Sequence, residues 1–209
     1  MRKPPPFFVP RRGYHHGSLK ESLLEAARHL ITERGTAGFS LAEAAKLVGV
    51  TGAAPYRHFS DRNELMGELA RRGFELFALR LGDAFGDGQP DAVTAFSRMG
   101  EAYLAFAHDE PGLYRAMFAD ATALDQPGPG AAADRALATL RQGAEAVLTY
   151  ADRADVDPRP LAFQIWALAH GVATLMLSGH LMADGQDTPR RILTEGVRAL
   201  VLAVPPRPA

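Results

Sequence analysis

The chain has 209 residues, of which 47% are hydrophobic and 22% are charged, and it contains no cysteine. This balance is typical of a globular protein, and the lack of cysteine excludes disulfides, zinc–thiolate sites, iron–sulfur clusters and cysteine nucleophiles. The sequence has neither a run of about 18 apolar residues nor a signal-peptide pattern at its start. We therefore expect a cytoplasmic protein that does not span a membrane.

Charge is distributed unevenly along the chain. Residues 1–72 hold 12 Lys and Arg against 7 Asp and Glu, whereas the remainder holds 11 against 17. The net charges of the two parts are therefore +5 and −6. A basic front attached to an acidic back indicates that the front meets a polyanion.

The first twelve residues contain four prolines and four basic residues, which predict a flexible basic arm. Such an arm is either a solvated tail or a DNA-binding segment, and both interpretations stay open. Its basic residues are Arg2, Lys3, Arg11 and Arg12. His15 and His16 follow, but adjacent side chains point apart and no third ligand follows, so we predict no metal site.

Three short helices are expected next. Apolar residues at helical spacing predict the first from Ser18 to Gly35, and the second and third are expected at 41–47 and from Thr51 to His58. The signals at their ends are capping-box spacings at Ser18 with Glu21 and at Ser40 with Glu43, a C-cap at Gly49 and an N-cap at Thr51. Ala45, Val50 and Phe59 are expected to face inward.

The rest of the chain also reads as helical. Caps, prolines and apolar spacing predict helices at about 61–85, 91–108, 111–118, 132–152, 158–181 and 189–202. Since no segment shows the alternation of a strand, the chain is predicted to be all-α, with about nine helices. We divide it into a basic arm (1–12), a three-helix helix-turn-helix domain (13–72), a helical bundle (73–204) and a tail (205–209).

The front part resembles the tetracycline-repressor (TetR) family. The resemblance is carried by Gly13-Tyr-His-His-Gly-Ser-Leu, by Ser40-Leu-Ala-Glu-Ala-Ala-Lys-Leu-Val-Gly-Val-Thr and by Pro55-Tyr-Arg-His-Phe-Ser-Asp-Arg-Asn-Glu-Leu. It implies a homodimeric transcriptional regulator, usually a repressor, that binds double-stranded DNA at a palindromic operator and releases it when a small effector binds. A shorter match, Trp166-Ala-Leu-Ala-His-Gly171, resembles a Trp…His-Gly type of C-terminal domain in the same family.

The resemblance also implies which residues meet DNA. Tyr56, His58 and Arg62 stand where the family contacts phosphates, so Arg62→Ala is expected to weaken binding to all sequences alike. Arg57 is the long donor of the reading helix and the candidate for guanine readout. Because its neighbours are nearly free of side chains, we expect DNA shape and the arm to add specificity. The candidate DNA-binding residues are Ser40, Thr51, Gly52, Ala53, Ala54, Tyr56, Arg57, His58, Arg62, Arg11 and Arg12.

Aromatic and methionine residues of the second part are either core or the lining of a pocket for a largely apolar effector. The candidate lining residues are Phe77, Tyr103, Phe106, Met117, Trp166 and His170, of which His170 is also readable as a hydrogen-bonded buried histidine. The last two helices have more apolar residues than one buried face needs, which favours a four-helix dimer interface. Its candidate residues are Leu168, Val172, Leu175, Leu193, Val197, Leu200 and Val201.

No nucleophile constellation, phosphate-binding glycine loop or zinc motif is visible. We therefore expect no enzyme, no cofactor and no metal. The main alternative is an architectural or constitutive DNA-binding protein without a ligand, whose bundle only dimerises. Turnover of a bound ligand would instead indicate an enzyme.

Overall fold

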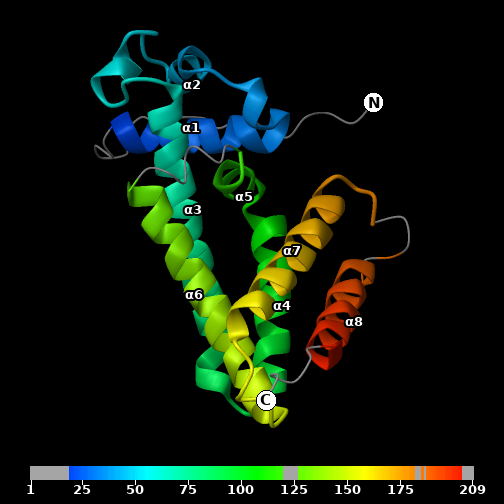
Figure 1. Ribbon diagram of the computed structural model, residues 1–209. Coiled ribbons are helices and arrows are strands. Elements are labelled where there is room, and N and C mark those ends of the chain that lie inside the picture. The colour runs from blue at the N-terminus through cyan, green and yellow to red at the C-terminus, as the bar shows by residue number, and fades with distance from the viewer. Residues whose placement is uncertain (1–18, 120–126, 182–184, 186, 204–209) are drawn as a thin grey trace.

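The computed structural model describes residues 19–119, 127–181, 185 and 187–203, and over these ranges it contains helices and no strand. Helices α1 (Leu19–Arg34) and α2 (Leu41–Val48) lie across one end of the molecule, and the long α3 (Arg62–Phe85) runs away from them (Figure 1). A 3₁₀ helix, η1 (Thr36–Gly38), connects α1 to α2, and a second, η2 (Ala54–Arg57), precedes α3. The predicted all-α class is confirmed.

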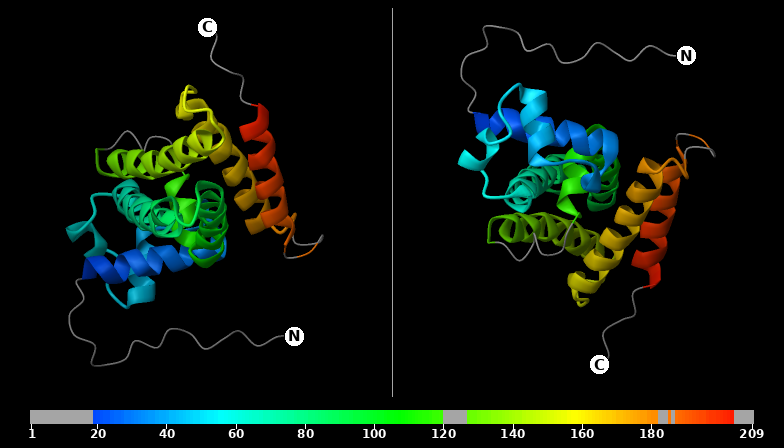
Figure 2. Two further views of the ribbon diagram at one scale, coloured as in Figure 1. Left: turned by 90° about the horizontal axis from the view of Figure 1, so that it is seen from below. Right: turned by 90° about the horizontal axis from the view of Figure 1, so that it is seen from above.

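The remaining helices form the larger body. Helices α4 (Ala92–Asp109) and α6 (Pro127–Tyr150) pack along α3, and a third 3₁₀ turn, η3 (Gly86–Gly88), joins α3 to α4. The short α5 (Pro111–Met117) lies between α1 and α3. Helices α7 (Pro158–Leu177) and α8 (Thr188–Ala203) pack together on one side of this body (Figures 1 and 2).

Local capping explains where several helices begin. The Asp61 carboxylate accepts from the Glu64 backbone N–H (2.9 Å), and the Ser60 N–H donates to the Glu64 carboxylate (2.6 Å), so the start of α3 is satisfied from both sides. At the end of α2, Gly49 has φ 82, the left-handed conformation that glycine adopts without a steric penalty. Both of these predicted boundaries are confirmed.

Three predicted boundaries are wrong. The expected helix over 51–58 is only the four-residue η2, because Gly52 favours coil and Pro55 lacks the N–H that an α-helix needs. Helix α6 begins at Pro127 rather than at 132, since prolines in a first helical turn lose no hydrogen bond. Helix α7 ends at Leu177, short of 181. Ser18 lies outside the described residues.

One continuous hydrophobic cluster joins the two parts of the chain. It includes Leu23 and Ile31 of α1, Phe59 after η2, and buried residues of α3 to α8. Ala45 and Phe59 face inward as predicted, and Val50 is half-buried. Because the cluster is unbroken, α1 packs directly on the larger body.

The two parts approach each other closely where α5 meets α1. A Cβ atom added at Gly112 would lie 2.4 Å from the Arg28 carbonyl oxygen and 2.6 Å from Thr32 Oγ1. Gly112 is buried, so no side chain fits between the helices. The missing side chain therefore sets the distance at which α5 packs on α1.

Gly112→Ala is expected to lower the free energy of unfolding by about 1–3 kcal/mol, the usual cost of overpacking. Gly82→Ala is the matched control, because Gly82 is exposed on α3 and an added Cβ there meets nothing within 4 Å. This control should gain up to about 1 kcal/mol from better helix propensity. Denaturant unfolding of both variants checks this, and a Gly112→Ala protein as stable as the wild type would contradict the close packing.

Candidate nucleic-acid interface and aromatic core

The candidate DNA-reading segment, residues 54–59, is a short turn that buried residues attach to the core. The Pro55 carbonyl accepts from the backbone N–H groups of His58 (2.9 Å) and Phe59 (3.0 Å), and Pro55 and Phe59 are buried. Tyr56 is instead 60% exposed, and Arg57 is exposed beside it. An element that contacts DNA needs this combination of buried residues that fix its position and exposed side chains that can reach the nucleic acid. Thr51, Gly52 and Ala53 precede it and are exposed, and Ala54 is half-buried.

Ser40 stands at the start of α2, but its hydroxyl is engaged within the protein. It accepts from the Glu43 N–H (3.2 Å) and donates to the Glu43 carboxylate (3.0 Å). Arg34 pairs with the same carboxylate at 3.1 Å. A phosphate at this helix end would therefore meet a capped N-terminus and an acid that is already paired.

Arg62 occupies the first position of α3, and its guanidinium points back to the α1–α2 connection. Nε donates to the Phe39 carbonyl (3.4 Å), Nη2 donates to the Thr36 carbonyl, and the group lies 4.8 Å from the centre of the Phe39 ring. Arg62 is half-buried. A guanidinium that makes these contacts within the protein is not directed at a phosphate, which is the role that the family resemblance implies for Arg62.

Most cations of residues 19–72 already have partners. Five arginines there make hydrogen bonds or ion pairs within the protein, and Lys20 lies 5.6 Å from the Phe59 ring centre. Within this described range, Lys46 and Arg57 are exposed and have no such contact. The other four basic residues of the front part, including Arg11 and Arg12, lie in residues 1–18, outside the described residues. The range 19–72 itself holds 8 basic and 7 acidic residues, so the positive excess belongs mainly to the arm.

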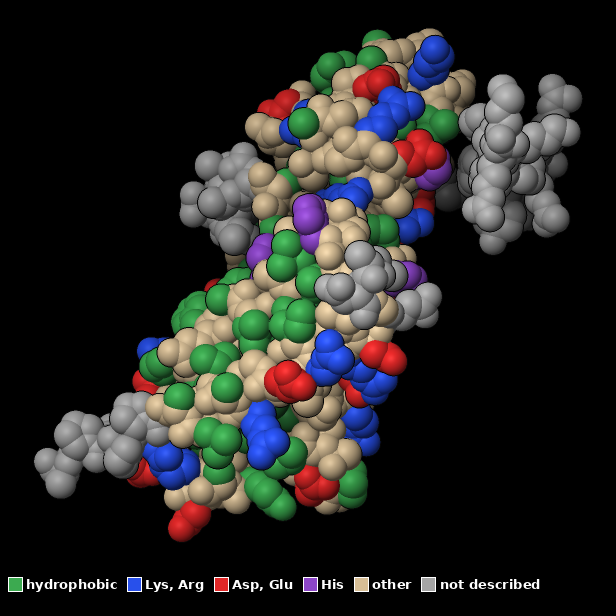
Figure 3. Space-filling view, turned by 90° about the vertical axis from the view of Figure 1, so that its right-hand side faces the viewer, with side chains coloured by type: hydrophobic (Ala, Val, Ile, Leu, Met, Phe, Trp, Pro, Cys, Tyr) green, Lys and Arg blue, Asp and Glu red, His purple; other side chains and the backbone are tan. Residues whose placement is uncertain are grey.

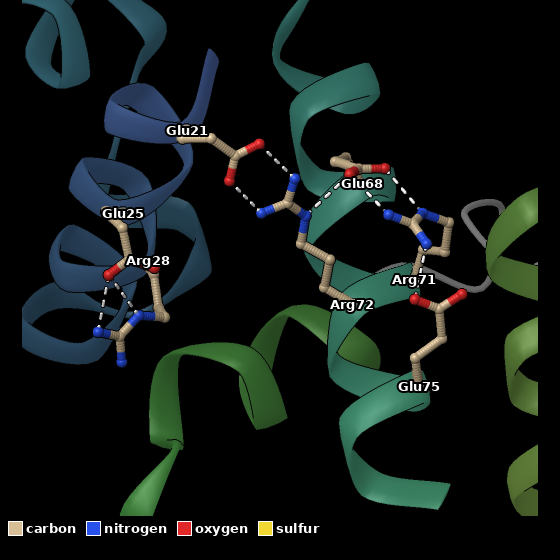
Figure 4. A network of polar contacts seen from close by, with 7 residues as sticks. All are labelled: Glu21, Glu25, Arg28, Glu68, Arg71, Arg72 and Glu75. Atoms are coloured by element: carbon tan, nitrogen blue, oxygen red, sulfur yellow. Dashed lines mark hydrogen bonds and ion pairs between the residues drawn. The ribbon is translucent and has the colours of Figure 1, made fainter. Parts of the chain in front are cut away.

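A network of ion pairs joins α1 to α3 (Figure 4) and reaches α6 through Arg135. Arg72 bonds both carboxylate oxygens of Glu21 on α1, at 2.6 and 2.7 Å, and Glu68 of its own helix at 2.8 Å. Arg71 bonds Glu68 and Glu75, and Arg135 of α6 reaches Glu75 at 3.2 Å. Hydrogen bonds from Arg71, followed by those from Arg72, lower the pKa of Glu68 to about 2. The network therefore needs ionised carboxylates.

Two further arginines tie α1 to the α4–α5 corner. Arg28 of α1 bonds Glu110 at 3.1 Å, and Arg115 of α5 donates to the carbonyls of Ile31 (3.1 Å) and Thr32 (2.7 Å). These contacts flank the close packing at Gly112. Helix α5 is thus fixed to the last turns of α1 by both shape and charge.

On its other side α5 enters an aromatic cluster. Phe77 and Tyr103 meet edge to face with ring centres 4.8 Å apart, and Phe77 lies 5.1 Å from Phe106. Phe118, at the end of α5, has ring centres 4.4 Å from His170 and 6.2 Å from Trp166. Rings from α3, α4, α5 and α7 thus converge at this point.

The cluster contains one chain of polar atoms. Tyr114 Oη lies 2.9 Å from His170 Nδ1 and 3.5 Å from Tyr103 Oη. Burial raises the pKa of Tyr114 to about 12 and raises that of Tyr103 as well, whereas burial lowers the pKa of His170. These three groups are therefore neutral hydrogen-bonding groups at neutral pH.

The structure brings together most of the predicted lining residues. Phe77, Tyr103, Phe106 and Met117 are at most 1% exposed, and Trp166 and His170 are half-buried. Met117 packs against α3, since a Cβ at Gly73 would lie 2.7 Å from its Cγ. Tyr114 and Phe118 were not among these candidates although they bridge them. Both were visible as aromatics, but their position between α3 and α7 depends on tertiary packing.

Helices α7 and α8 leave an apolar face uncovered. Phe163 (51%), Leu175 (46%) and Leu202 (73%) are exposed, and hydrophobic side chains gather at the height of these helices in Figure 3. Helix α7 is long and apolar enough to cross a membrane by composition alone, with 33% of the segment buried. Its exposed positions from 163 to 178 are uncharged.

The predicted interface residues divide into three groups by burial. Leu175 is exposed, whereas Val172 and Leu193 are buried within the protomer at 3% and 4% exposure and cannot add surface to an interface. The others are half-buried between the two helices or against the body, as Leu168 is beside Gly196; they are Leu168, Val197, Leu200 and Val201. Apolar periodicity alone could not separate intramolecular from free faces.

Two family models match the chain. The model of bacterial regulatory proteins of the tetR family covers residues 23–69. The model of the tetracyclin repressor-like C-terminal domain covers residues 96–200, half of the chain. The first match spans the reading segment, and the second contains most of the aromatic cluster.

Individual relatives agree with this. An uncharacterized HTH-type transcriptional regulator, YobS of Bacillus subtilis (strain 168), is 28% identical over 100 residues, which is 48% of this chain and 51% of YobS. The match thus spans about half the length of that curated relative. A protein of unknown function from Rhodococcus sp. RHA1 is 28% identical, with a TM-score of 0.74 over 92% of this chain and 98% of its own. The regulator PfmR of Thermus thermophilus, at 18% identity, shares the fold with a TM-score of 0.66 over 88% of this chain and 98% of its own.

Arg72→Met is expected to lower the free energy of unfolding by about 1 kcal/mol at pH 7, the scale of partly exposed ion pairs. The pKa of Glu68 falls from 4.5 to about 2 on folding, so its contribution is complete at neutral pH and is lost as the pH falls through this window. The difference between variant and wild type should therefore shrink between pH 5 and about pH 2. Arg141→Met, at an exposed position of α6 outside the network, should change little. Equal losses at pH 7 and about pH 2 would argue against the ion pairs as the cause.

Proposed function

The chain belongs to the TetR family of bacterial transcriptional regulators, and we propose that it is a cytoplasmic, homodimeric repressor that a small, largely apolar effector releases from a palindromic operator. The observation that carries this is the position of α5. One side of α5 packs on α1 of the helix-turn-helix unit, and its other side supplies Tyr114 and Phe118 to the aromatic cluster. A ligand in the cluster would displace an element that touches the DNA-binding unit.

DNA contact is proposed for the exposed turn and for the arm. Tyr56 and His58 would meet phosphates, Arg57 a base edge, and the small residues 51–54 would let the backbone approach the groove. Ser40 would contact a phosphate only by giving up its hydrogen bonds with Glu43, and Arg11 and Arg12 belong to the arm. Because the arm holds most of the net positive charge of residues 1–72, it would dominate the salt dependence of binding.

Operator selection followed by a salt titration tests this. Deleting residues 2–12 removes four basic residues and should weaken binding and flatten the slope of log affinity against log salt by up to about 0.9 for each phosphate that is no longer neutralised. Arg57→Ala should keep a similar slope but cost about 1–3 kcal/mol at one base position of the selected site. An unchanged slope after the deletion would show a solvated tail, and an unchanged sequence logo would remove Arg57 from readout.

The exposed face of α7 and α8 is proposed to dimerise with its symmetry mate. A second copy supplies the same uncharged α7 positions, and the family model that spans these helices supports this choice of partner. A two-fold axis is also what the operator requires, because successive major grooves present two half-sites about 34–36 Å apart.

Leu175→Glu should therefore give monomers with little operator affinity, because an unpaired carboxylate would be buried in the interface. Leu79→Glu is the control, since Leu79 is 59% exposed on α3, away from this face. Sedimentation velocity distinguishes the two outcomes. A Leu175→Glu protein that remains dimeric would place the interface elsewhere.

The effector is proposed to be mostly apolar and uncharged or weakly polar. The cluster consists of packed rings, and a charged group placed among them would lack a compensating partner. Tyr103, Trp166 and His170 would orient the ligand through hydrogen bonds. We propose no catalytic role, so a ligand should be recovered unchanged.

The alternative, a constitutive DNA-binding protein, is favoured by how closely the rings pack, with centres 4.4–6.2 Å apart around Phe118. A screen that follows the fluorescence of Trp166 and the release of operator DNA separates the two. Neutral aromatic and aliphatic compounds should shift the fluorescence and release DNA, and His170→Leu should weaken that response. Release only by highly charged metabolites would contradict the apolar effector, and no release by any compound would support the constitutive protein.

A further inference from the structure

We propose that Arg62 is a positioning residue, which holds the α1–α2 connection in place for DNA binding and does not itself neutralise a phosphate. The inference rests on the proposed DNA binding, but it assigns Arg62 a different role from the one implied by family resemblance. Its basis is the placement of the guanidinium on two carbonyl oxygens and one ring, all within residues 36–39.

The segment that Arg62 holds is irregular and leads directly into α2. Gly35 has φ 76, η1 spans Thr36–Gly38, and Phe39 is extended and only 4% exposed. Ser40, the N-cap of α2, follows at once. The bond from Arg62 to the Phe39 carbonyl therefore fixes the backbone one residue before the helix-turn-helix motif begins.

Arg62 also connects this segment to the core of the protein. It is the first residue of α3, and the Asp61 cap and the buried Leu65 hold that end of α3 in place. The side chain thus ties the start of α3 to the start of α2 across a separation of 23 to 26 residues. A movement of α3 would be carried to α2 through this contact.

The contact requires arginine specifically. A planar guanidinium donates to two acceptors at once while stacking on an aromatic face, whereas a lysine ammonium is a point charge without a flat surface. Lysine at this position would keep the charge but could not donate to both carbonyls while lying flat on the ring. This difference separates the positioning role from a phosphate contact, which either residue can make.

The experiment compares Arg62→Ala, Arg62→Lys and Lys46→Ala in the full-length protein. Lys46 is the matched control because it is an exposed cation of α2 without a partner in the described residues. Affinity for the selected operator is measured over a salt series, and backbone hydrogen exchange over residues 36–44 is measured without DNA.

A positioning role predicts that both Arg62 variants bind about tenfold more weakly, the scale of losing hydrogen bonds to a charged group. The salt slope should match that of the wild type, and exchange should rise across residues 36–44 in both variants but not in Lys46→Ala. Arg62→Lys should therefore restore neither the wild-type affinity nor the wild-type exchange.

Two outcomes would overturn the proposal. A phosphate contact would flatten the slope by about 0.9 in Arg62→Ala, leave exchange unchanged and be rescued by lysine. Unchanged affinity and unchanged exchange in both variants would show that Arg62 does not hold the α1–α2 connection in place. If the wild type bound no DNA, the proposed function would fail, and the exchange measurement would still decide whether Arg62 orders the connection. Should Arg62→Ala not fold, Arg62→Lys carries the same comparison.

Discussion

The packing of α5 against α1 is the constraint on which the rest of the structure depends. At Gly112 the two helices meet backbone to backbone, and arginine contacts on either side prevent sliding. Side chains of α5 beyond this point must then lie among the rings of α3, α4 and α7. A change in that cluster cannot be absorbed by a flexible linker, because no long loop separates it from the helix-turn-helix unit. The proposed effector would therefore have to act by shifting the position of helices.

Arginine contributes to this protein mainly as a structural cation. Guanidinium groups span α1 to α3, α3 to α6, α1 to the α4–α5 corner and α3 to the α1–α2 connection. Each of these contacts is partly exposed, so each is worth little in stability on its own. What these contacts share is that each joins two different elements and so adds a fixed polar contact to the apolar packing between them. The charge that remains available for DNA is correspondingly small within the described part of this unit.

The sequence predicted contacts between residues close together in the chain and missed contacts between residues far apart in it. The pairs Ser40 with Glu43 and Asp61 with Glu64 cap helices within four residues, so local pattern sufficed to place them. The partner of Arg72 lies 51 residues away, and nothing in the neighbourhood of either residue in the sequence identifies the other. Apolar spacing likewise identified faces without identifying their neighbours, which is why Val172 and Leu193 were assigned to an interface although they are buried within the protomer. The helix expected over 51–58 was wrong because Gly52 and Pro55 oppose the α-helix that the N-cap at Thr51 had indicated.

The uncharged outer face of α7 has a consequence for how such a regulator responds to its own abundance. If an operator is occupied only by the pair of protomers, if pairs are the minority species and if most operators are empty, then occupancy rises with the square of the protomer concentration. Halving synthesis would then reduce occupancy about fourfold in that regime. A weaker or stronger α7 contact would shift the expression level at which this steep response occurs, without any change in the residues that touch DNA. The face proposed to dimerise would then set the protein concentration at which the operator fills, as well as the spacing of the two DNA-binding units.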